Sequence, residues 1–140
     1  MLSSAAPAPN AEEIKLAPQR MQVGDAALLI DVALPAGYHL NEAAPQRAQV
    51  SIVRGAPQLA FAGSETTLTR AGRDVRLPLR VPLRAAAAGA SELSIKLTLY
   101  YCRTDNTGTC RIKTLALRAP VEVTTDANAA REITARGEIK

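Results

Sequence analysis

Aromatic residues are scarce in this sequence, which contains no tryptophan, one phenylalanine and three tyrosines among 140 residues. A hydrophobic core must therefore be built from leucine, isoleucine, valine and alanine. The hydrophobic fraction of 47% is ordinary for a globular protein, and the length is typical of one domain. The composition thus argues against a chain that is disordered throughout.

Long apolar runs are also missing. No stretch approaches the roughly 18 apolar residues of a membrane-spanning helix, so we expect no direct membrane insertion. The first ten residues, MLSSAAPAPN, lack the apolar region of a secretory signal. We interpret residues 1–11 as a flexible leader or linker and expect the domain over residues 12–125. A polar tail follows at 126–140, in which REITARGEI is a candidate last edge strand.

Strong charge and metal-ligand clusters are absent too. The net charge is only +4, and no aromatic-basic platform accompanies it, so we expect no nucleic-acid partner. The single histidine, His39, and two cysteines give at most three soft ligands, so we expect no metal site. We interpret His39 as a turn residue that hydrogen-bonds the backbone. There is no phosphate-binding loop or nucleophile motif, and we expect no cofactor.

Alternation with a period of two dominates the middle of the chain. In VRLPLRVPLR, at residues 75–84, apolar residues alternate with arginine and proline, the pattern of a strand with one buried face. Pro78 and Pro82 lack N–H groups on the same side of that strand, which indicates a sheet edge. About seven to eight such strands and no strong helix predict an all-β antiparallel sandwich, with an open barrel as the alternative.

The two cysteines flank a polar turn in LTLYYCRTDNTGTCRIKTL. If Cys102 lies opposite Cys110, Leu97 faces Leu115, and the apolar faces of the two strands coincide. A slip of two residues preserves that coincidence but places the cysteines diagonally, which is poor geometry for a disulfide. The pattern therefore permits a cross-strand disulfide without requiring it.

Cys102 lies on the polar face of its strand, which predicts a position at the rim of the sandwich, away from its core. A structural disulfide there would stabilise the fold by roughly 2–3 kcal/mol through loop closure. A redox-active pair is the other interpretation, because exposed cross-strand disulfides are the more easily reduced ones. Arg103, Arg111 and Lys113 would favour a thiolate if their side chains approach the sulfurs.

Three segments, GYHLN, VRLPLRVPL and LSIKLTLYYCRTDNTGTCRIKTLALRAPVEV, together resemble the N-terminal immunoglobulin-like domain of the DsbD family of thiol:disulfide interchange proteins. The likeness runs over about residues 24–123. The last segment is also similar to the C-terminal β-sandwich module of thioredoxin-like proteins that carry NHL repeats.

The resemblance implies an immunoglobulin-like sandwich in which Cys102 and Cys110 form a redox-active disulfide. It also implies a thioredoxin-fold partner, exported client proteins and a periplasmic or otherwise exported location. Aromatic neighbours of the disulfide are implied at Tyr38 with His39, at Tyr101, and at Phe61 near a capping loop.

Two functions thus remain open. One is a thiol–disulfide exchange module acting through Cys102 and Cys110. The alternative is a non-catalytic accessory sandwich with a structural hairpin disulfide, which mediates domain or protein interaction. The alternative to an exported location is a cytoplasmic one, as a domain of a larger protein.

Overall fold

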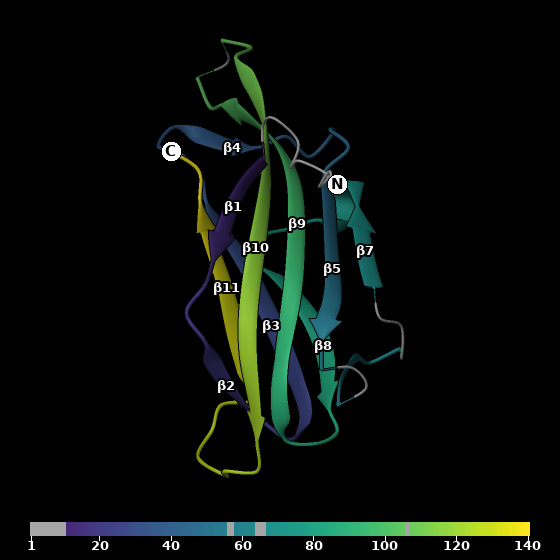
Figure 1. The fold of residues 1–140 in the computed structure, drawn as a ribbon. Helices are drawn as coiled ribbons and strands as arrows, with labels where there is room; N and C mark the ends of the chain where they lie inside the picture. The colour runs from purple at the N-terminus through teal and green to yellow at the C-terminus, as the bar shows by residue number, and fades with distance from the viewer. Residues whose placement is uncertain (1–10, 56–57, 64–66, 106) are drawn as a thin grey trace, which may run out of the picture.

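The computed structural model describes residues 11–55, 58–63, 67–105 and 107–140, with the backbone alone for residues 11 and 12. Of the expected leader at 1–11, residues 1–10 lie outside the described residues, and Ala11 is the first residue of a strand. The described chain consists of strands, loops and one short 3-10 turn, η1 (Gly72–Asp74), and two sheets pack face to face (Figure 1). The predicted all-β sandwich is therefore confirmed. Among the described residues, no helix has the length and apolar character needed to cross a membrane.

The larger sheet has seven strands in the order β1-β10-β9-β5-β7, with β2 paired to β10 and β4 paired to β9. Its strands are β1 (Ala11–Lys15), β2 (Gln19–Gln22), β4 (Tyr38–Leu40), β5 (Arg47–Arg54), β7 (Thr67–Ala71), β9 (Gly89–Arg103) and β10 (Cys110–Thr124). The smaller sheet has the order β11-β3-β8-β6. Its strands are β3 (Gly24–Ala33), β6 (Leu59–Phe61), β8 (Leu79–Ala85) and β11 (Glu132–Glu138).

The topology is immunoglobulin-like. In an immunoglobulin sandwich, strands A, B, E and D form one sheet, and C, F and G form the other. Here β3, β8 and β6 lie in the B, E and D positions, and β5, β9 and β10 lie in the C, F and G positions. The described residues form more strands than the seven or eight expected. The N-terminal segment is broken into β1 and β2, and the three-residue β4 and β6 are too short to show a period.

Most strand pairings are antiparallel as predicted, but three are parallel. β1 and β2 run parallel to β10, and β11 runs parallel to β3. Two strands joined directly by a hairpin must be antiparallel. The terminal strands β1, β2 and β11 are not joined to their partners by a hairpin, so they can pair in parallel. The C-terminal segment is more than a polar tail, because β11 and the residue after it bury Ile133, Ala135 and Ile139 in the core.

The core is aliphatic, as the composition predicts. Its buried residues are mostly leucine, isoleucine, valine and alanine from both sheets, with Met21, Phe61 and Tyr101 as the largest exceptions. On β9 and β10 every second residue is buried through the body of the sandwich, which fixes the register between them.

The β8 segment departs from the expected edge strand. Its arginines point outward as predicted, but β8 lies between β3 and β6. β6 pairs only with Leu83–Ala85, so among the described residues only Leu79–Pro82 has an open side. Pro82 lies just past the end of β6, and its carbonyl accepts the Ala62 N–H at 3.4 Å. Pro78 precedes the strand altogether.

Candidate functional site

The candidate site is built on the β9–β10 hairpin, whose tip projects beyond the two sheets (Figure 1). Cys102 pairs with Cys110 in the same register that pairs Leu97 with Leu115. The two sulfurs form a disulfide across Cα atoms only 4.0 Å apart. One residue further on, the Arg103 N–H donates to the Thr109 carbonyl at 2.9 Å. The cysteines therefore occupy a non-hydrogen-bonded position, where opposed side chains come closest.

The disulfide lies on the outer face of the larger sheet. Leu99 and Tyr101, three residues and one residue before Cys102, are buried on the inner face. Cys102 itself is half-buried, and Cys110 is exposed. The disulfide is thus accessible to another protein from the solvent side, and its two cysteine residues are unequally covered.

β4 explains the unequal cover. It pairs with the edge of β9 that faces away from β10, and it places His39 directly opposite Cys102. His39, Cys102 and Cys110 therefore form one row across three strands on the outer face. Hydrogen bonds from Asn41 N to Tyr100 O and from Thr104 N to Gly37 O, both at 2.9 Å, extend this pairing.

His39 does not make the backbone hydrogen bond that was expected for a turn residue. Its side chain is exposed and forms no hydrogen bond with the described part of the chain. His39 lies in strand β4, directly opposite Cys102, and not in a turn.

The aromatic residues expected beside the disulfide lie behind it. Tyr38 and Tyr101 project to the opposite face of β4 and β9, and their rings meet edge to face at 5.4 Å. The guanidinium carbons of Arg103 and Arg111 lie 5.9 and 5.6 Å from the centre of the Tyr38 ring. This cluster fastens β4 to the hairpin from the inner side.

The same alternation places the basic residues away from the sulfurs. Arg111 pairs with Tyr101 and Lys113 pairs with Leu99, so both start from the inner face. Arg103 binds Asp105 through Nε and Oδ2 at 2.9 Å. None of the three leaves the strand on the face of the disulfide, so the expected stabilisation of a thiolate by these residues has no support in the register.

Phe61 is not brought to the disulfide. It is buried in the core and pairs with Leu83 near the end of β8. β8 leads through a short connection into the start of β9, whereas Cys102 lies near the end of that 15-residue strand. Residues 64–66 of the expected capping segment lie outside the described residues.

The hairpin tip is ordered by hydrogen bonds of its own. Asp105 accepts from the Thr107 hydroxyl at 2.8 Å and from the Thr107 N–H at 3.2 Å. These bonds, led by that from the hydroxyl, lower the pKa of Asp105 below its ordinary value, and the Arg103 ion pair adds to the effect. The hydrogen bond to Asp105 in turn raises the pKa of Arg103. Asn106 lies outside the described residues.

Gln46 is a residue of the site that sequence reasoning missed. Its side chain is only 2% exposed and lies where β4 ends and β5 begins along the edge of β9. Its Nε2 donates to the carbonyls of Asn41 and Tyr100 at 2.8 and 2.9 Å, and its Oε1 accepts the Tyr100 N–H at 2.8 Å. The Gln46 side chain thus bonds the backbone N–H and carbonyl of Tyr100 in place of a neighbouring strand, two residues before Cys102. No sequence signal distinguishes it from a surface glutamine.

A groove of about 880 Å³ adjoins β4. Its lining includes His39, Glu42, Arg73 and Arg76, from β4, the loop after it and the segment around η1. His39 therefore borders the groove as well as the disulfide.

Ile112 and Tyr100 form an apolar pair next to the disulfide. They oppose each other two residues before Cys102 and two after Cys110, on the same outer face. Ile112 is 46% exposed, and the only other large hydrophobic residue exposed among those described is Val53, at 48%. Ile112 shares its face with Cys110, so the alternation of the sequence could have identified it.

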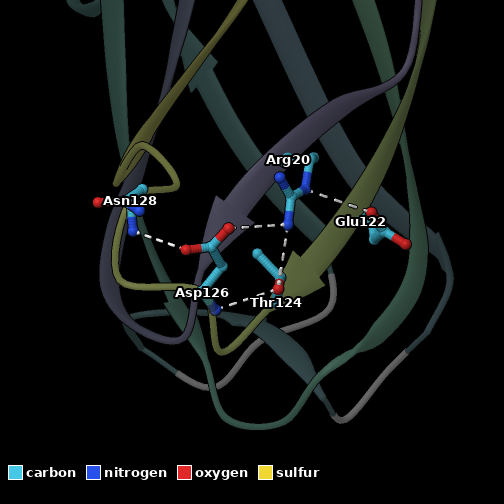
Figure 2. Close-up of polar contacts among 5 residues, drawn as sticks. All are labelled: Arg20, Glu122, Thr124, Asp126 and Asn128. Carbon is cyan, nitrogen blue, oxygen red and sulfur yellow. Dashed lines mark hydrogen bonds and ion pairs between the residues drawn. The ribbon is translucent and has the colours of Figure 1, made fainter.

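A second polar cluster lies at the far end of β10 (Figure 2). Arg20 contacts Glu122 at 3.5 Å and Asp126 at 3.3 Å, and the Asn128 N–H donates to Asp126 at 2.9 Å. The bond from Asn128, together with Arg20, lowers the pKa of Asp126. Each charge here has a partner, and the cluster holds the loop between β10 and β11 against β2.

Among the described residues, no three His, Cys, Asp or Glu side chains are grouped to hold a metal ion. No protein-family model matches the chain, and no curated protein matches its sequence. The fold and the disulfide therefore carry the functional argument.

Proposed function

We propose that this domain is a thiol–disulfide exchange module that acts through Cys102 and Cys110 with a thioredoxin-fold partner. The observation that carries the proposal is the placement of the disulfide on the solvent face of the hairpin, with Cys110 exposed. A disulfide must be reachable by an incoming thiolate to exchange. The resemblance of the hairpin segment to DsbD-type domains supports the same conclusion.

The hairpin does not depend on the disulfide for its shape. The β9–β10 ladder continues from the cysteines to Gly89 and Val123, and β4 adds a third strand at the tip. Opening the bond would cost about 2–3 kcal/mol of loop-closure stabilisation, below the typical 5–15 kcal/mol stability of a domain. The reduced form therefore stays folded, as a redox cycle requires.

The difference in exposure sets the order of events. A partner thiolate attacks the Sγ of Cys110, a mixed disulfide forms between the partner and Cys110, and the electron pair of the broken bond goes to the Sγ of Cys102. The partner's second thiolate then attacks the partner's first sulfur, which is bonded to Cys110 in the mixed disulfide, and Cys110 is released as a thiolate. The domain gains two electrons and two protons, and the partner becomes a disulfide. The reverse sequence passes the electrons to a client disulfide.

Tyr100 and Ile112 give the partner a surface to bind. Ile112 is exposed and Tyr100 is half-buried on the strand face next to the disulfide, and an apolar side chain in that position suits an apolar patch on another protein. Oxidising compartments such as the periplasm keep such disulfides formed between cycles, and we place the domain there.

The reduction potential tests the proposal. The protein is equilibrated with glutathione or dithiothreitol buffers, and its free thiols are alkylated and counted. We expect a potential of about −200 mV, whereas a value below about −300 mV identifies a structural disulfide and the accessory-domain alternative. The Cys102→Ser/Cys110→Ser variant serves as the stability control, with an expected loss of about 2–3 kcal/mol and an unchanged fold.

Trapping tests the order of attack. A thioredoxin that lacks its second active-site cysteine should form a mixed disulfide with the oxidised protein. Alkylation during the reaction blocks the freed thiol before it can re-form the original disulfide, and peptide mapping should find the mixed disulfide at Cys110. Mapping to Cys102 contradicts the proposed order, and the absence of any complex contradicts the exchange itself.

A further inference from the structure

We infer that the protonated imidazole of His39 stabilises the Cys102 thiolate, or transfers a proton to it, when the disulfide opens. This role makes exchange faster at acidic pH. The inference rests on the proposed function and deepens it, because it assigns a residue to the leaving group.

The register carries the argument. Gly37 and Thr104, then Asn41 and Tyr100, are joined by backbone hydrogen bonds, so His39 and Cys102 form the directly opposed pair between them. Opposed residues of an antiparallel ladder have Cβ atoms about 4.5–5.5 Å apart and point to the same face. An imidazole on His39 is therefore long enough to reach the Cys102 sulfur once that sulfur leaves Cys110.

No other cation is placed to do this among the described residues. On the outer face around the disulfide, the neighbours are Tyr100, Thr104 and Ile112, which carry no positive charge. Arg103, Arg111 and Lys113 leave their strands on the inner face, as shown above. On the groove side, His39 is bordered by Glu42, Arg73 and Arg76 from the loop after β4 and the η1 region.

The chemistry balances without any further reactant. When a partner thiolate attacks Cys110, the electron pair of the breaking bond goes to Cys102, and an imidazolium at His39 either pairs with that thiolate or transfers its proton to it. Transfer leaves a thiol at Cys102 and a neutral imidazole, which regains a proton from water. In the reverse direction the neutral imidazole takes the proton from Cys102 as the thiolate re-forms the disulfide.

The expected effect follows from leaving-group chemistry. A thiol leaves faster when its pKa is lower, and a positive charge nearby lowers the pKa of a thiol by about one unit or more. With a sensitivity of about one half, the rate constant rises about threefold. Histidine side chains are charged only on the acidic side of their titration, roughly between pH 5 and 8, so the rise appears as the pH falls through that range.

The experiment measures the rate of reduction of the oxidised protein by dithiothreitol from pH 5.5 to 8.5, divided by the dithiothreitol thiolate concentration at each pH. For the wild type we expect this corrected rate constant to be about threefold higher at the acid end. His39→Gln should give a low and flat profile, and His39→Lys, charged throughout, a high and flat one. Thermal unfolding of each variant establishes that the fold is intact.

Identical profiles for the wild type and His39→Gln overturn the inference, as does a failure of His39→Lys to restore the high rate. Either result leaves the exchange function standing, because the reduction potential and the mixed disulfide are measured separately. Conversely, a potential below about −300 mV removes the exchange function whatever the pH profile of His39.

Discussion

Gln46 should contribute more to stability than any other polar side chain near the site. Replacing it with alanine removes three hydrogen bonds of 2.8–2.9 Å at once. The Tyr100 carbonyl keeps the Asn41 N–H as a donor, and the Asn41 carbonyl keeps the Ala44 N–H. The Tyr100 N–H loses the only acceptor that the described residues offer it, so Gln46→Ala leaves one buried donor without a partner.

A net value of about 1 kcal/mol for each of the two bonds to carbonyls that keep another donor, with a penalty of about 1–3 kcal/mol for the stranded donor, gives an expected loss of about 3–5 kcal/mol. Because Gln46 also holds Asn41, at the end of β4, the variant should loosen β4 beside Cys102. Hydrogen exchange at the Tyr100 and Asn41 amides should accelerate more than at amides in the middle of β9.

Urea unfolding measures the loss, which should appear as a lower midpoint at an unchanged slope. Gln49→Ala is the matched control: Gln49 lies three residues away on β5, and its side chain makes no hydrogen bond within the described residues. The control should change stability by no more than about 0.5 kcal/mol. If Gln46→Ala lowers the free energy of unfolding no more than Gln49→Ala does, the side chain of Gln46 does not form stabilising hydrogen bonds with Tyr100 and Asn41.

Two further predictions concern the docking face and the far end of the sandwich. Ile112→Ser should lower kcat/KM for exchange with a thioredoxin about fivefold, because about 1 kcal/mol of apolar burial with the partner is lost. The equally exposed Val53→Ser, placed on β5, should leave it unchanged; equal losses would place the docking surface elsewhere. Asp126→Asn should destabilise the protein at neutral pH, because the lowered pKa of Asp126 reflects a carboxylate favoured by the folded state. That stabilisation is present above the ordinary pKa and is lost progressively as the pH falls from about 4 through the lowered folded-state pKa, so the gap between the urea midpoints of wild type and variant should narrow over that range; a constant gap contradicts the linkage.

The hairpin could be predicted because its information is local. Alternation along residues 93–101 and 115–121 restricts the register to steps of two, and the cysteines make one of those registers chemically favourable. The core composition follows from the near absence of aromatic residues. Alternation also identifies β8 as a strand, but it does not give the position of β8 within the sheet. Whether a proline strand lies at an edge depends on how far a neighbour such as β6 extends, and three residues carry no periodic signal.

The asymmetry of the site, by contrast, comes from pairing that the sequence does not encode locally. β4 is three residues long and lies more than 60 positions before Cys102, so no period or spacing connects them. Its placement still decides the chemistry, because Cys102 beside β4 is half-buried while Cys110 is exposed, and because β4 brings the only histidine opposite Cys102. Gln46 fixes that placement through hydrogen bonds that a surface glutamine would not make. A loosened β4 should therefore lose both effects together: in Gln46→Ala the corrected reduction rate should become less dependent on pH, and mixed disulfides should form at both cysteines. If the pH profile and the preference for Cys110 survive in that variant while β4 exchanges its amides freely, the asymmetry has another origin.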